Sequence, residues 1–272
     1  MMDADPAMTV APRIYSKYIT NMETSPDEGR TGLPLGTGTF HLSKLSISAD
    51  RILRLQGYRD LPRVRRQIRS AAEEMATLAA ELSEAQVHYR VAAVSAFDGC
   101  RLRTDDHTVL ECEAFGRYLL GSSQVIALVA TLGTRLDDVV IGMIERFEPL
   151  EALLLETAGW LAIELTTKAF HDHVYRELLP PGHRLSPRMA PGYSYRLAGK
   201  EVAWPLEQQR ELFGLLDSGD LPVTLLDSCA MKPKMSRSGL YGVLPSSRAV
   251  DRRNGDRPGA SESHSTTSRH LM

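Results

Sequence analysis

The sequence predicts an α+β fold with a largely antiparallel β-sheet. Segments with helical periodicity and segments with strand-like composition alternate irregularly along the 272 residues, without the repeated strand–helix–strand units that build parallel sheets. Apolar residues make up 43% of the chain, which is ample for a buried core. We expect one domain at residues 41–244, between a poorly ordered N-terminal segment (1–40) and a disordered tail (245–272).

The two ends of the chain lack the apolar content of the middle. Residues 1–40 mix Pro, Gly, Thr and Asp, and residues 245–272 are rich in Ser, Arg and Gly. Such segments bury too little surface to offset the entropy lost on ordering. Gly36-Thr37-Gly38 looks like the start of a dinucleotide-binding fingerprint, but the third glycine is missing and no strand is predicted before it, so we assign no nucleotide site there.

Two helices are expected at the start of the domain. Residues 48–57 carry Ser and Asp at the beginning and Gly57 at the end, which is typical of a short capped helix. Pro62 is expected to open a second helix, because apolar residues recur after it every three or four positions. The residues of this core-facing stripe are Val64, Ile68, Ala71, Met75, Leu78 and Leu82.

Strands and long helices follow. Residues 87–97 and 107–112 are expected as strands, the first from its β-branched and aromatic content. Residues 122–131 form a continuous apolar run ended by Leu132-Gly133, which favours a buried strand. Helices are expected at residues 134–146 and 150–179, the second being the longest in the chain.

The last third of the domain mixes one helix with two strands. Residues 206–217 have the periodicity of an amphipathic helix. The apolar content of residues 221–226 indicates a strand, and residues 237–244 are expected to form the last one.

Charge and composition argue against several classes of partner. The net charge is −2 and the pI is near 6.5, so no global basic field attracts nucleic acid or an anionic membrane. The run Arg63, Arg65, Arg66 and Arg69 is interpreted as the solvated face of one helix. The longest apolar segment, residues 150–163, is too short and too charged to span a bilayer.

The cysteines and the N-terminus favour a cytoplasmic protein. Cys100, Cys112 and Cys229 are widely spaced and odd in number, and without a CxxC pair a zinc knuckle or a dithiol redox centre is not expected. The first ten residues lack the basic and apolar regions of a signal peptide. We therefore expect residence in a reducing compartment, the cytoplasm.

Other motifs of catalysis fail when their spacing is considered. His171 and His173 are two residues apart on a predicted helix and point in nearly opposite directions, so they cannot share a metal ion and are interpreted as surface histidines. Nucleophile-elbow and P-loop motifs are missing. Residues 105–110 nearly match the DxHxxG loop of corrinoid-binding proteins, but Leu110 replaces the glycine, so we interpret them as a turn. We assign neither catalytic residues nor metal ligands.

Residues 185–193, LSPRMAPGY, form a stretch of unusually fixed backbone. Pro187 and Pro191 lock φ at two places, and Gly192 allows a flat ligand to approach the main chain. Extended N–H and C=O groups suit the edge of an adenine, and Arg188 offers a planar fork for a carboxylate. An ordinary Pro/Gly loop with a surface Arg is the interpretation that these residues alone favour.

Three segments taken together change this interpretation. They are RMAPGY (188–193), WPLEQQRELFGLLD (204–217) and LLDSCAMKPKMSRSGLYG (225–242). In order and spacing they resemble the S-adenosylmethionine-binding activation domain of cobalamin-dependent methionine synthase. The last segment follows the pattern L-T-E-S-x-x-M-x-P-x-x-S-x-S-G without a gap from Met231 to Gly239.

The N-terminal half resembles the stand-alone version of that domain. The segments concerned are ADRILRLQGY (49–58), ATLGTRLDD (130–138) and LLETAGWLAIE (154–164). The resemblance covers roughly residues 45–244 and implies a C-shaped single domain with a twisted antiparallel sheet flanked by helices.

The resemblance also implies a binding site for S-adenosylmethionine. Arg188 takes the place of the family arginine that contacts the ligand, and the main chain of Ala190 and Tyr193, next to Gly192, would hold the adenosine. Tyr241 falls near the methionine moiety. Glu164 falls where the family has an acidic residue on the long helix.

Glu164 also lies at the edge of an apolar stripe on the predicted long helix. A carboxylate at the edge of an apolar stripe is costly to bury without a cationic partner. The ligand's ammonium or sulfonium is one candidate partner, and a nearby arginine is the other.

Two features depart from the family pattern. Leu226-Asp227 replaces the Thr-Glu pair, and the loop at residues 194–203 is longer than we expect in stand-alone relatives. The loop borders the expected ligand site and is therefore a candidate for altered affinity or altered choice of partner.

The implied function is reactivation. A stand-alone chain of this kind would bind S-adenosylmethionine and support reductive methylation of cob(II)alamin on a separate corrinoid-binding methyltransferase, with cobalamin carried by that partner and a flavodoxin- or ferredoxin-like protein donating the electron. The expected partner is a methionine synthase without its own activation domain. The alternatives are another corrinoid methyltransferase or demethylase system, or a sensing module without a part in the chemistry.

Overall fold

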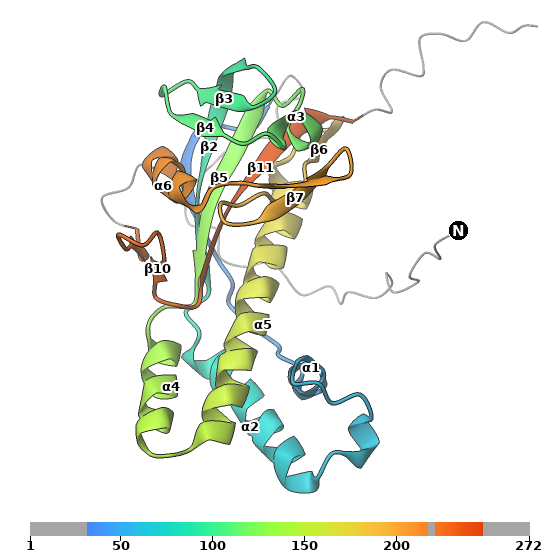
Figure 1. Cartoon of the computed structure of the whole chain (residues 1–272), viewed down its shortest axis with the longest axis vertical. Coiled ribbons are helices and arrows are strands. Elements are labelled where there is room, and N and C mark those ends of the chain that lie inside the picture. Colours follow the sequence, from blue (N-terminus) through green and yellow to red (C-terminus); the bar gives the residue numbers. More distant parts are fainter. Residues whose placement is uncertain (1–31, 217–220, 247–272) are drawn as a thin grey trace, which may run out of the picture.

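The structure is a computed structural model that describes residues 32–216 and 221–246. Within these residues, seven strands form one antiparallel sheet in the order β4-β3-β2-β5-β11-β6, and β1 pairs with β2 (Figure 1). The strands are β1 Gly36–His41, β2 Gln86–Phe97, β3 Arg101–Thr104, β4 Val109–Glu111, β5 Gln124–Thr131, β6 His183–Leu185 and β11 Ser236–Pro245.

One face of the sheet is covered by helices that also extend beyond it (Figure 1). These are α1 Ala49–Leu55, α2 Arg66–Leu82, α4 Arg135–Glu145 and α5 Pro149–His173, which ends in the π-helical turn η2 Val174–Leu178. The apolar stripe expected after Pro62 packs here, and its Met75 is buried in the same core cluster as the α5 residues Leu155 and Phe170. We call this cluster, between the sheet and helices α1, α2, α4 and α5, the helix-side core; it holds α5 against the sheet.

The opposite face carries a second core beneath α6 Gln209–Leu216 and the short helix α3 Phe115–Tyr118. Trp204 and Leu212 are fully buried in this core, which also contains Val129 of β5. All eight residues of β5 are buried because the strand is covered on both faces, which explains its continuous apolar run. The smaller elements are η1 Leu61–Arg63, η3 Leu206–Gln208, the pair β7 Ser194–Leu197 and β8 Lys200–Ala203, and the pair β9 Thr224–Leu225 and β10 Met231–Lys232.

The α+β class with an antiparallel sheet is confirmed, as are the helices after residues 48, 134, 150 and 206. The second helix does not start at Pro62. The proline lies in the 3-10 turn η1, Val64 is extended, and α2 begins at Arg66, so the arginine run is divided between two elements. The strand expected at residues 221–226 is only the two residues of β9.

The boundary expected at residue 40 falls inside a strand. Residues 36–41 form β1, which pairs with β2 over its whole length, and Phe40 packs against Phe170 with ring centroids 5.9 Å apart. These residues are therefore part of the domain rather than poorly ordered. Expectations for residues 1–31 and 247–272 lie outside the described residues. Among the helices of the described part, none has the length and apolar character needed to cross a membrane.

Candidate functional site

The stretch 185–193 lies along the free edge of β11. The amide of Met189 donates to the carbonyl of Leu240 (2.9 Å), and the amide of Leu240 donates back to Met189 (2.7 Å). The amide of Ser186 donates to the carbonyl of Gly242 (2.9 Å). This stretch therefore continues the sheet beyond β6, and it places the residues that follow Ser186 at a fixed position beside β11.

Arg188 lies across β11 at Gly239. A Cβ added to Gly239 would lie 2.7 Å from Cγ of Arg188, so only glycine leaves room for this side chain. Nη1 of Arg188 donates to the carbonyl oxygen of Ser238, and the guanidinium carbon lies 5.4 Å from the ring centroid of Tyr193. The half-exposed ring of Tyr193 is thus held beside a fixed positive charge.

Tyr241 lies on the same face of β11, two residues beyond Gly239. Its ring is buried, and this burial raises the pKa of Tyr241 to about 12, although Arg188 and Arg237 pull in the opposite direction. The phenol therefore stays neutral at physiological pH. The structure brings Arg188, Tyr193 and Tyr241 together around Gly239.

The two α5 histidines have separate surroundings. His171 packs against Tyr241 with ring centroids 5.6 Å apart, whereas His173 stacks on Phe40 at 5.0 Å. Both are partly buried rather than fully on the surface, and burial lowers the pKa of His173. No group of three or more His, Cys, Asp or Glu side chains suited to a metal ion occurs among the described residues.

The main chain expected to face adenosine is bonded within the protein. The amide of Ala190 donates to Oη of Tyr195 (2.6 Å), and this hydroxyl lies 3.1 Å from the carbonyl oxygen of Ala190, to which it donates. The carbonyl of Tyr193 accepts from the amide of Trp204 (2.9 Å), and the exposed Gly192, with φ at +82°, donates its amide to Trp204 (2.8 Å). A nucleoside that uses the Ala190 edge must displace the Tyr195 hydroxyl.

Tyr195 comes from the segment that we expected to be a long loop. Residues 194–203 form a β-hairpin, β7 and β8, whose first strand directs Tyr195 back onto Ala190. The turn of the hairpin consists of Ala198 and Gly199, which lie between the two four-residue strands and both adopt positive φ. Two-residue hairpin turns favour glycine for this reason, so Gly199 is the signal for the hairpin in the sequence.

Glu164 is exposed, so burial does not require a cationic partner for its carboxylate. Its side chain is 56% exposed on α5, and Oε2 lies 3.8 Å from Nη2 of Arg51 on α1. An exposed carboxylate incurs little desolvation cost, so the partner is not needed for stability. Its contact with Arg51 is long, which leaves the carboxylate accessible to a ligand.

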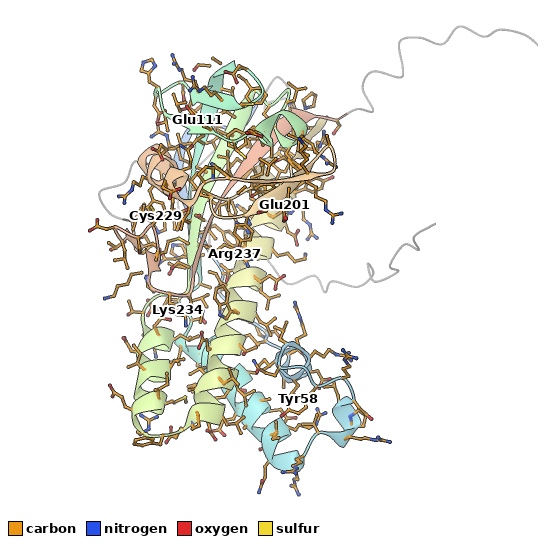
Figure 2. The ribbon with its side chains drawn as sticks, viewed as in Figure 1. Tyr58, Glu111, Glu201, Cys229, Lys234 and Arg237 are labelled. Atoms are coloured by element: carbon orange, nitrogen blue, oxygen red, sulfur yellow. The ribbon has the colours of Figure 1, made fainter. Side chains whose placement is uncertain are left out.

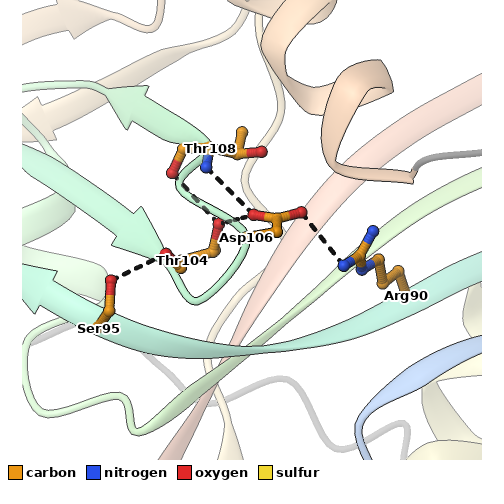
Figure 3. A network of polar contacts seen from close by, with 5 residues as sticks. All are labelled: Arg90, Ser95, Thr104, Asp106 and Thr108. Atoms are coloured by element: carbon orange, nitrogen blue, oxygen red, sulfur yellow. Dashed lines mark hydrogen bonds and ion pairs between the residues drawn. The ribbon is translucent and has the colours of Figure 1, made fainter.

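The DxHxxG-like residues form a turn between β3 and β4, as expected (Figure 3). Asp106 accepts hydrogen bonds from the Thr104 hydroxyl and from the amide of Thr108 (3.1 Å), and it pairs with Arg90 at 3.2 Å. Burial raises the pKa of Asp106, but these hydrogen bonds and the charge of Arg90 outweigh it and hold the pKa below its ordinary value. These contacts give Asp106 a structural role in the turn.

Comparison with known proteins supports the expected fold. The crystal structure of the MetH reactivation domain bound to AdoHcy is similar, with a TM-score of 0.57 and 13% sequence identity, over 82% of this chain and 84% of that chain. No family model matches the sequence, and no curated protein matches it. The chain therefore has the methionine synthase reactivation-domain fold.

Proposed function

We propose that the chain binds S-adenosylmethionine beside β11 and supports the reductive methylation of cob(II)alamin on a separate corrinoid-dependent methyltransferase. The observation that carries this proposal is the convergence of Arg188, Tyr193 and Tyr241 around Gly239. The fold adds support, since the similar MetH domain is bound to AdoHcy. We further propose that the partner is a methionine synthase without a reactivation domain and that a flavodoxin- or ferredoxin-like protein supplies the electron.

The residues around Gly239 fit an S-adenosyl ligand. Arg188 provides a guanidinium for the carboxylate, and the exposed ring of Tyr193 provides a face for the base or for the sulfonium cation. The Ala190 edge pairs with a group that both donates and accepts, as its bonds to the Tyr195 hydroxyl show, and the adenine edge has the same two capacities. S-adenosylmethionine supplies an electrophilic methyl group when bound, and the contribution of these residues is to position it.

A reconstituted reactivation assay tests the proposal. A methionine synthase truncated before its reactivation domain is brought to the cob(II)alamin state and mixed with flavodoxin, reductant and methyl-labelled S-adenosylmethionine. We expect label to enter the cobalamin only when this chain is present. Failure with this synthase but transfer to another corrinoid protein would support the demethylase alternative, and ligand binding without transfer to either would contradict the proposal.

The bonds between Tyr195 and Ala190 favour a second candidate, a module that senses the nucleoside through movement of its hairpin. A sensor requires a contact that the ligand breaks, and the two Tyr195 bonds provide one. A hairpin that changes its protease sensitivity on ligand binding, without methyl transfer, would identify this function.

We expect Tyr195→Phe to bind S-adenosylmethionine about three- to tenfold more tightly than the wild type. The substitution removes the hydroxyl that occupies Ala190 and keeps the ring that packs against Tyr118. Tyr118→Phe is the matched control, because its hydroxyl lies 3.5 Å from the carbonyl of Arg196 and away from the Ala190 edge. Calorimetry measures the change, and unchanged or weaker binding by Tyr195→Phe would show that the ligand does not use this edge.

A further inference from the structure

Arg237 projects from the same face of β11 as Gly239 and Tyr241. Side chains alternate between the faces of a strand, and the β5 residues opposite these three positions, Ala130, Leu128 and Ile126, belong to the helix-side core. The intervening Ser238 and Leu240 point to the other face, where Ser238 bonds the Gln209 side chain of α6. Arg237 therefore projects on the side of the sheet where α5 lies (Figure 2).

The contacts between β11 and α5 show which turn of the helix lies at the level of Arg237. At one end, a Cβ on Gly159 would lie 3.1 Å from Sδ of Met235, and at the other end Tyr241 packs on His171. The strand between these contacts spans about 20 Å and the helix about 18 Å, so the two elements advance together. Two residues beyond Met235, Arg237 is therefore level with the turn of α5 that carries Glu164.

The two arginines on this face make no ion pair with an acidic side chain of the described residues. Among the described residues, neither Arg188 nor Arg237 forms an ion pair, and Arg188 instead donates to the carbonyl of Ser238. Arg188 lies over Gly239, the second residue after Arg237, so the two side chains are neighbours on β11. Burial raises the pKa of Tyr241, Arg188 and Arg237 lower it, and Asp172 raises it, which indicates that the two arginines and Asp172 all lie near its phenol.

Glu164 supplies a negative charge at this level of α5. It is an exposed carboxylate whose one ion pair among the described residues is the 3.8 Å contact to Arg51, and it lies on the turn of α5 that is level with Arg237. A positive pair facing a negative group matches the carboxylate and ammonium of an α-amino acid. A nucleoside alone has neither charge.

We propose that Arg237 is a second ligand for the carboxylate of the bound amino-acid moiety, acting with Arg188, while Glu164 binds the ammonium group. The inference rests on the proposed function and narrows it, because the site then selects nucleosides that carry an intact α-amino acid. Adenosine derivatives without the carboxylate bind through the base and sugar alone. Arg237 is a specificity residue in this account and takes no part in the methyl transfer.

Calorimetry with two ligands tests the inference on the full chain. AdoHcy carries the amino acid, and 5′-methylthioadenosine has the same adenosine and sulfur without it. We expect Arg237→Gln to weaken AdoHcy binding about ten- to a hundredfold and to leave 5′-methylthioadenosine binding unchanged. Arg237→Lys keeps the charge and loses the planar fork, so we expect its affinity for AdoHcy to lie between those of the wild type and Arg237→Gln.

Arg66→Gln is the matched control, since Arg66 is exposed at the start of α2 and forms no ion pair within the described residues. Thermal unfolding checks that each variant is folded. If the wild type binds neither ligand, the proposed function fails. If the wild type binds AdoHcy and Arg237→Gln binds it equally well, or loses both ligands to the same extent, the proposed function stands and the role of Arg237 is refuted.

Discussion

Replacing Trp204 with alanine is expected to lower the free energy of unfolding by about 3–5 kcal/mol. The indole is fully buried beneath α6 and meets Phe115 edge-on, with ring centroids 4.9 Å apart. Its removal leaves a cavity in the second core. The main chain of Trp204 bonds Gly192 and Tyr193, so we also expect the cavity to loosen the backbone beside Arg188. Urea unfolding followed by circular dichroism measures the loss.

The other tryptophan of the chain provides the control. Trp160 lies on α5 with 45% of its surface exposed, and we expect Trp160→Ala to cost less than about 1 kcal/mol. We expect Trp204→Phe to cost less than Trp204→Ala, because it keeps an aromatic ring and removes an indole N–H that has no acceptor in the described part of the chain. Equal losses at positions 160 and 204 would contradict the description of the second core.

Arg188→Ala is expected to weaken S-adenosylmethionine binding about a hundredfold. The variant loses the guanidinium that lies over Gly239 and removes the cation beside the Tyr193 ring. Because Arg188 bonds only one carbonyl oxygen and makes no ion pair among the described residues, we expect the fold to survive with a loss of about 1 kcal/mol. Equilibrium dialysis measures the affinity.

Arg184→Ala is the control for Arg188→Ala. Arg184 lies four residues earlier, exposed on β6, and forms no ion pair in the described residues. We expect the affinity of Arg184→Ala for S-adenosylmethionine to equal that of the wild type. Wild-type affinity in Arg188→Ala would remove this residue from the site, and an equal loss in both variants would show an effect of overall charge.

Periodicity predicted the elements whose stability comes from burial. The continuous apolar run of β5 and the stripe of α2 follow directly from their positions in the two cores. The local pattern does not predict β1, because its residues, GTGTFH, carry little apolar signal and are ordered by pairing with β2, a distant segment of the chain. Pairing between distant segments is not visible in a local pattern.

The candidate site was predicted in part, and the parts that were missed have specific causes. The resemblance to the activation domain implies roles for Arg188, Tyr193 and Tyr241, and the structure brings these three residues together. The motif leaves position 237 open, so it does not point to Arg237, whose direction follows only from strand alternation around Gly239. The sequence does not predict the contact of Tyr195 with Ala190, because this contact depends on the turn of a hairpin where a loop is expected.

Isothermal titration of the wild-type chain with S-adenosylmethionine tests the central claim most directly, because every proposed role of Arg188, Tyr193 and Tyr241 requires this ligand. The account predicts saturable binding of about one ligand per chain, competed by AdoHcy. Absence of binding by folded protein at millimolar ligand, in both titration and equilibrium dialysis, would contradict it.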